Sequence, residues 1–266
     1  VSNAGTLTIT NSRIADNLAS KLGGGIFIAA GANLSITDSV FDHNIASDAG
    51  GGLYLETQGG VTSTITLNRI SVTNNTASGS GGGGIFISTS ADITNSLIAN
   101  NSTSGFTGGG GGLKIYEDGS GDPITVSVTN VTISGNTTVG QGGGVDVSLQ
   151  QAADAVTFNN VTIADNHRNV MPGPPAIYGG GGIFASGPEP LDLQNSILAG
   201  NTSQNGTGTL IGGPDCEGTI NSLDYNLIQD TTSCIISGTT THNKTGVSAN
   251  LGALANNGGS TLTMSL

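Results

Sequence analysis

Residues that could act as acids, bases or metal ligands are few and widely spaced in this sequence. Glu117, Asp118 and Asp122 fall in one segment and could hold a calcium ion through their oxygen atoms, or could simply form an acidic, solvated loop. The histidines lack the spacing of metal ligands and fall in different predicted loops: His43, His167 and His242. The first two are expected in solvated turns. We therefore predict no resident cofactor.

Two cysteines, Cys216 and Cys234, lie in the last quarter of the chain. If they pair, closing a loop of this length contributes roughly 3 kcal/mol to stability. The alternative is two buried free thiols. A disulfide, together with the scarcity of lysine and the many Asn-x-Ser/Thr triplets, would favour an oxidising, extracellular or cell-surface setting.

A short motif recurs through the first three quarters of the chain and is the main signal of the fold. Its copies occupy 11–17, 38–44, 69–75, 95–101, 130–136, 160–166 and 195–201. The motif is constant while the length between copies varies, which is typical of a solenoid with loops of different size. Each copy closes on asparagine: Asn17, Asn44, Asn75, Asn101, Asn136, Asn166 and Asn201. Identical side chains stacked along an axis can hydrogen-bond into a ladder, so we interpret these asparagines as structural.

Apolar residues around the motif predict three strands in each coil. They alternate before the motif opens, as at Leu7 and Ile9, which indicates a strand with one buried face. The alternation breaks at the opening position, such as Asn11, where a left-handed bend is expected. Another strand follows each glycine run, with the glycines at a corner.

These patterns together predict a right-handed single-stranded parallel β-helix, an all-β solenoid. About seven regular coils would span 1–201. Residues 202–266 would form an irregular C-terminal end of the same domain, as further coils or a cap. The chain starts partway through a predicted coil and stops inside an alternating strand, so we expect a processed product or part of something longer.

Four aromatic side chains take outward positions in the glycine-led strands: Phe27, Tyr54, Phe86 and Phe184. An exposed aromatic row is costly without a partner. It could stack on sugar rings, bury a loop of the same chain, or form a subunit interface, and we favour the last two. Lys114 and Asp146 share this column, and we interpret them as an exposed pair worth less than about 1 kcal/mol.

Parallel β-helices also carry polysaccharide lyases and hydrolases, so an active site has to be considered. Such sites need several carboxylates at equal offsets in adjacent coils. The sequence contains no such cluster, and we predict that the chain is not an enzyme. The strand before each motif has an outward face rich in threonine and serine, including Thr66 and Thr129. That face could be a plain surface, a glycan-bearing or glycan-binding face, or an ice-binding plane.

Charge and hydropathy exclude two classes of partner. The net charge is −12 and only 6 residues are basic, all scattered, so nucleic-acid binding is not expected. No apolar stretch reaches the roughly 18 residues of a membrane span.

The paired signals, a GGx[IL] run and an apolar residue followed three positions later by asparagine, resemble the repeats of bacterial polymorphic outer-membrane proteins. In that family the motifs are GGA[ILV] and FxxN, and the resemblance covers about 1–201. The segment from Cys216 to Cys234 and the final stretch 250–266 (NLGALANNGGSTLTMSL) are similar to the C-terminal ends of CSLREA-type β-helix surface proteins. The resemblance implies a secreted or surface-displayed passenger and carries no catalytic residues.

The expected function is therefore structural or adhesive, outside the cell or on its surface. The expected partners are further copies of the chain, other surface proteins or glycans, and assembly could run end to end into a fibre, sheath or layer. The alternatives are a polysaccharide-active enzyme and a glycan- or ice-binding module.

Overall fold

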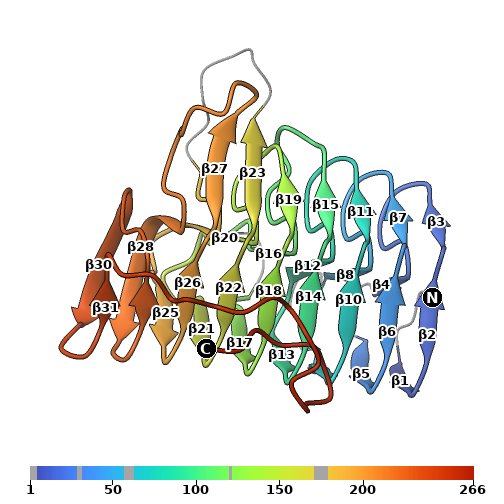
Figure 1. Ribbon diagram of the computed structural model, residues 1–266. Helices are drawn as coiled ribbons and strands as arrows, with labels where there is room; N and C mark the ends of the chain where they lie inside the picture. Colours follow the sequence, from blue (N-terminus) through green and yellow to red (C-terminus); the bar gives the residue numbers. More distant parts are fainter. Residues whose placement is uncertain (1–4, 29–31, 57–62, 120–121, 171–178) are drawn as a thin grey trace.

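The computed structural model describes residues 5–28, 32–56, 63–119, 122–170 and 179–266. Over these residues the protein is all-β, and its strands pair in parallel in three sheets, as expected of a parallel β-solenoid. Figure 1 shows the chain winding so that equivalent strands lie side by side along one long axis. No helix in the described part of the chain is long and apolar enough to cross a membrane.

Each regular coil contains four strands, one more than the sequence predicted. The additional strand has two residues in most coils and directly follows the motif asparagine. Together these strands form the short-strand sheet: β3 (Leu18–Ala19), β7 (Ile45–Ala46), β11 (Thr76–Ala77), β15 (Ser102–Thr103), β19 (Thr137–Thr138), β23 (His167–Val170) and β27 (Thr202–Asn205). Two-residue strands are too short to show an alternating pattern, so they cannot be recognised from side-chain period.

The strands within the motif copies form a second sheet, which we call the motif sheet. Its members are β2 (Arg13–Ala15), β6 (Val40–Asp42), β10 (Ser71–Thr73), β14 (Leu97–Ala99), β18 (Thr132–Ser134), β22 (Thr162–Ala164), β26 (Ile197–Ala199), β29 (Leu227–Ile228) and β31 (Lys244–Thr245). The last two extend this sheet into the C-terminal region, which was predicted to be irregular.

Two further rows of strands belong to the third sheet. The Thr/Ser row contains β1 (Thr6–Thr10), β5 (Asn33–Thr37), β9 (Ile65–Asn68), β13 (Ala91–Thr94), β17 (Thr125–Thr129), β21 (Ala155–Asn159) and β25 (Leu191–Gln194). The glycine-led row contains β4 (Ile26–Ile28), β8 (Leu53–Glu56), β12 (Ile85–Ser88), β16 (Leu113–Tyr116), β20 (Val145–Ser148) and β24 (Ile183–Ser186). Strand β28 (Cys216–Leu223) pairs with both rows and joins them, and β30 (Cys234–Thr239) pairs with β28.

Left-handed residues make the corners of the coils. The opening position of each motif has positive φ, as at Asn11 (46°) and Asn130 (56°). A second left-handed residue, which the sequence analysis did not anticipate, lies immediately before the motif asparagine, as at Asn100 (56°). A third is a glycine ahead of the glycine-led strand, as at Gly110 (64°). Asparagine, aspartate and glycine tolerate this conformation best, which explains their enrichment at these positions.

The core runs along the inside of the solenoid. Alternate residues of the Thr/Ser row and of the glycine-led row face inward. The central residue of each motif strand also faces inward. The side chains of all these residues form one continuous buried cluster. Leu53, Ile85 and Leu113 show the register of one inward column, and all three are fully buried. The periodicity predicted from sequence is confirmed in these columns.

The segment after β31 returns along the outside of the solenoid. Figure 1 shows it crossing in front of the motif sheet. Its only regular feature among the described residues is an antiparallel bridge between Ala255 and Thr263. The outward side chains of Leu97 and Thr132, in the middle of the motif sheet, are buried. The outward side chain of Val40, near the N-terminal end of the sheet, is exposed. The burial and the view agree that this segment covers the middle of the sheet.

Candidate functional site

The predicted site residues lie in three separate places. The motif asparagines line the interior, the cysteines lie at the C-terminal end, and the aromatic residues lie on the outer side of the glycine-led row.

The motif asparagines hydrogen-bond to one another along the axis. Asn101 is typical: its backbone N–H and its Nδ2 both donate to Oδ1 of Asn136, at 2.9 and 3.0 Å. Its Nδ2 also donates to the carbonyl of Val72, at 2.9 Å. Its own Oδ1 accepts the same pair of bonds from Asn75. The pattern is continuous from Asn17 to Asn201.

The last glycine of the run, directly before the glycine-led strand, makes room for this ladder in successive coils. A Cβ on Gly112 would lie 2.8 Å from Nδ2 of Asn136 and 3.0 Å from the carbonyl oxygen of Gly144. A Cβ on Gly84 would lie 2.9 Å from Nδ2 of Asn101. The glycine run and the asparagine motif therefore depend on each other, because the asparagine amide occupies the space that a side chain on the glycine would need.

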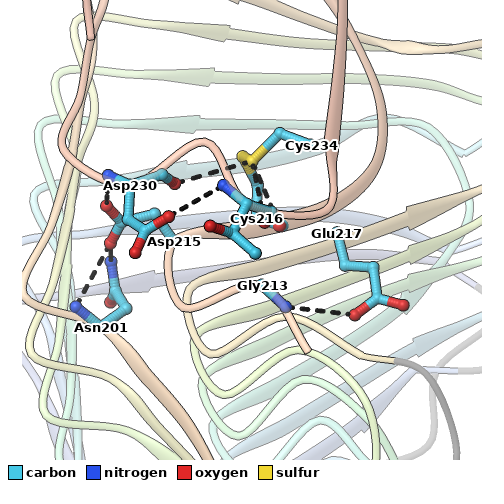
Figure 2. The surroundings of a disulfide bond; sticks show 8 residues. Asn201, Gly213, Asp215, Cys216, Glu217, Asp230 and Cys234 are labelled. Carbon is cyan, nitrogen blue, oxygen red and sulfur yellow. Dashed lines mark hydrogen bonds between the residues drawn. A yellow bond between two sulfur atoms is a disulfide. The ribbon is translucent and has the colours of Figure 1, made fainter. Parts of the chain in front are cut away.

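The ladder ends on Asp215, a residue that the sequence analysis did not single out. One carboxylate oxygen accepts from Nδ2 of Asn201 at 2.8 Å, and the other accepts from the backbone N–H of Asp230. Figure 2 shows this arrangement beside the disulfide. Asp215 only accepts hydrogen bonds, so a carboxylate suits the last rung. Burial raises the pKa of Asp215 even though these hydrogen bonds act to lower it.

Cys216 and Cys234 form a disulfide with their Cα atoms 5.3 Å apart (Figure 2). Cys216 is fully buried and pairs in register with Ile183, so it continues an inward column of the core. The bond ties β28 to the start of β30, and Cys234 packs against the main core at this end of the solenoid.

Three of the four predicted aromatic residues stack on one another. The ring centroids of Phe27 and Tyr54 are 5.6 Å apart, and those of Tyr54 and Phe86 are 4.7 Å apart. Tyr116, which was not predicted, extends the row with a tilted ring at 6.2 Å from Phe86. Phe184 does not belong to it, because Lys114 and Asp146 occupy the intervening positions of the register.

The surroundings of these rings differ from the exposed row that was expected. Tyr54 and Phe86 are only 7% and 6% exposed, and both pack with Ala49 in a small apolar cluster outside the main core. The other residues packed against this cluster are Leu22, Phe27 and Tyr116. Burial within the chain is one of the two outcomes that the sequence analysis favoured.

The interpretation of Lys114 and Asp146 as an exposed pair is wrong. Asp146 is fully buried and Lys114 is 8% exposed, with 3.3 Å between Nζ and Oδ2. Nζ also donates to the carbonyl of Ser80 at 3.1 Å, and Ser148 donates to Oδ1 of Asp146. Burial raises the pKa of Asp146, against the opposing effect of Lys114. Gly109, in the connection that precedes β16, lies against the carboxylate of Asp146, and the path of this connection is not encoded in the periodic pattern.

A pocket of about 310 Å³ lies beside the stacked rings. We call it the aromatic pocket, and its lining combines aromatic, aliphatic, hydroxyl and charged side chains: Leu22, Asp48, Ala49, Tyr54, Ser80, Phe86, Thr107, Lys114 and Tyr116. These residues come from successive coils, so the regular winding of the chain brings them together.

The other candidate residues do not assemble into a site. The described residues contain no group of three or more His, Cys, Asp or Glu side chains placed to hold a metal. Glu117 is buried and accepts from the backbone N–H of Gly119, while Asp122 is exposed. In the Thr/Ser row, Asp92 and Asp192 interrupt the outward hydroxyl column.

Each histidine contacts a different polar neighbour. His43 is in an exposed turn beside Asp42, as expected. His167 lies on strand β23 rather than in a turn, and its Nδ1 contacts Thr202. His242 contacts Asp224 through Nδ1 at 2.6 Å.

Arg168 is a buried residue that the sequence analysis did not recognise. It occupies the inward column of the short-strand sheet, where other coils carry Ala46, Ala77 or Thr138. Its guanidinium donates to the carbonyl of Gly140 at 2.6 Å and to Ser203 at 3.0 Å. Arg168 therefore connects β23 to the neighbouring coils where the strands of the short-strand sheet lengthen from two residues to four.

A scan against protein-family models and searches of curated proteins and of solved structures found no match to this chain.

Proposed function

We propose that this chain is an extracellular or cell-surface structural and adhesive protein, built as a right-handed β-helix with about seven regular coils. The observation that carries the proposal is the asparagine ladder, which is buried from Asn44 onward and hydrogen-bonded continuously from Asn17 through Asn201 to Asp215. The most regular polar residues of the sequence are thus used to fix the stacking of coils. Such a chain makes a stiff, elongated support.

The disulfide supports the proposed location. Disulfides persist in oxidising compartments and are rare where thiols are kept reduced. Cys216 and Cys234 join the last strands of the solenoid, where a repeat structure has fewer neighbours to stabilise it. The resemblance of the repeat to bacterial polymorphic outer-membrane proteins supports the same location and an adhesive role. The proposed partners are surface molecules or further copies of this chain.

Antibody labelling tests the location. Antibodies raised against the purified chain should label intact cells of the source organism. Labelling that appears only after permeabilisation would contradict the proposal.

Light scattering tests self-association. The particle mass should rise with protein concentration if copies of the chain assemble. A monomer over a wide concentration range would remove assembly from the proposal and leave adhesion to other surface molecules.

A further inference from the structure

The aromatic pocket has the size of a site for one small ring-shaped molecule. Ligand pockets commonly have volumes of about 300 to 1,000 Å³, and the roughly 310 Å³ found here is at the lower limit. The pocket is therefore suited to a single residue of a larger molecule or to a small free ligand, not to an extended chain lying within it.

A ligand can reach the middle ring of the stack, Tyr54, only at its edge. Tyr54 is covered by Phe27 on one face and by Phe86 on the other, so a flat aromatic ligand cannot stack on it. Ring edges carry partial positive charge and ring faces partial negative charge. The edges therefore favour electronegative atoms such as hydroxyl and ether oxygens. Leu22 and Ala49 add aliphatic contact for C–H groups.

The polar lining provides both donors and acceptors. An ammonium group has three N–H donors, and Ser80 and Asp146 accept from at most two of those on Lys114, whose Nζ also lies 5.6 Å from the centroid of the Tyr116 ring. Asp48 uses Oδ1 to accept from the N–H and the hydroxyl of Ser80, at 3.0 and 2.6 Å, which leaves acceptor capacity on its carboxylate. Burial, reinforced by Glu56 and Asp48, raises the pKa of Tyr54, so its hydroxyl stays protonated.

The charge of the pocket disfavours anionic ligands. The positive charge of Lys114 lies 3.3 Å from the carboxylate of Asp146, so it is not an isolated anion site. Asp48 adds negative charge at the rim, and the whole chain has a net charge of −12, which repels polyanions. A neutral ligand that both donates and accepts hydrogen bonds, with C–H groups on part of its surface, satisfies all of these conditions.

From this we infer that the aromatic pocket binds one neutral pyranose sugar, as a free monosaccharide or as the terminal residue of a surface glycan. Ring and hydroxyl oxygens would face Lys114 and the aromatic edges, hydroxyl groups would donate to Asp48, and the C–H groups would pack against Leu22 and Ala49. The inference deepens the proposed adhesive role and rests on it for the biological source of the sugar.

Saturation-transfer NMR with the whole chain tests the inference. The probes are the methyl glycosides of glucose, galactose, mannose and N-acetylglucosamine, with benzoate as a flat aromatic anion for comparison. At least one pyranoside should bind, while benzoate should not. Binding of benzoate alone, or of no pyranoside, would overturn the assignment.

Two tryptophan variants locate the binding. Thr107 is an exposed residue of the pocket lining, so Thr107→Trp should fill the pocket, leave the fold intact and weaken pyranoside binding at least tenfold. Ser186→Trp is the matched control, because Ser186 is exposed on the same row of strands outside the pocket. Circular dichroism checks both folds. Equal binding by Thr107→Trp and the unaltered chain would overturn the site. Surface labelling of cells does not depend on either result, so the two proposals can fail separately.

Discussion

Asn101 illustrates how much one side chain contributes to this fold. It is fully buried, donates three hydrogen bonds and accepts two more through Oδ1. Every polar atom of the amide therefore has a partner in a neighbouring coil. A buried polar group that loses its partner costs about 1–3 kcal/mol, so the loss of one rung affects the rungs on both sides.

We expect Asn101→Ala to lower the free energy of unfolding by about 3 kcal/mol, because the donors of Asn75 and the carbonyl of Val72 lose their buried partners. Urea denaturation followed by circular dichroism measures the change. The control is Asn100→Gly, at an exposed neighbour whose φ of 56° glycine adopts without strain. The control should change stability by less than about 0.5 kcal/mol. Equal effects of the two substitutions would contradict the structural role of the ladder.

Asp42 provides an acid-sensitive contribution at the surface of the motif sheet. Partial burial alone would raise its pKa, but hydrogen bonds from Asn74, His43, Thr73 and Arg13 outweigh it and hold the pKa well below the usual range. A carboxyl with a lowered pKa stabilises the fold above its unfolded pKa, near 4, and this stabilisation is lost as the pH falls toward the folded value.

Asp42→Asn should therefore destabilise the protein at pH 6 and make less difference at pH 2.5. The measurement is the urea midpoint of both proteins across this range. A gap between the two midpoints that stays constant with pH would show that Asp42 does not contribute through its charge.

At the scale of elements, the sequence alone predicted the features that repeat in every coil and missed those that occur in one coil only. The inward columns, the left-handed opening positions and the glycine corners follow from side-chain period and from the conformations that Asn and Gly tolerate. The stacking of Phe27, Tyr54 and Phe86 also follows from equal offsets in successive coils.

The features that the sequence analysis missed depend on connections of unequal length. Lys114 and Asp146 were expected at the surface, but both are buried, and the connection before β16 lies against Asp146. On β16 the aromatic column is occupied by Lys114, and Tyr116 lies two residues further along the strand. Its ring contacts Phe86 of the preceding coil in a tilted arrangement, which the period does not predict. Asp215 follows Asn201 by 14 residues, about half a normal coil, so the period did not point to it as the next rung.

Removal of the disulfide should destabilise the C-terminal strands. It closes a loop with a sequence separation of 18, for which chain entropy predicts about 3 kcal/mol. The variant carrying both Cys216→Ala and Cys234→Ala should lose roughly that amount in urea denaturation. Hydrogen exchange should accelerate most in β30 and little in β12, because each coil contacts only its neighbours. A uniform acceleration along the chain would show that the bond stabilises the whole solenoid and not this end.

At the scale of the whole molecule, stability is close to a sum over interfaces between adjacent coils. The ladder adds the same set of hydrogen bonds at successive interfaces, which keeps their strengths similar. A chain of similar interfaces can unfold in one transition, whereas a chain with one weak interface in the middle can separate into two cooperative blocks.

Asn101→Ala places such a weak point between the coils of β10, β14 and β18, with regular coils on both sides. We expect differential scanning calorimetry of this variant to show a van't Hoff enthalpy below the calorimetric enthalpy, the mark of unfolding in more than one step. Asn17→Ala removes the exposed first rung instead, so it should leave the number of transitions unchanged. A single transition in Asn101→Ala would mean that the continuous hydrophobic core couples distant coils strongly enough to override the break in the ladder.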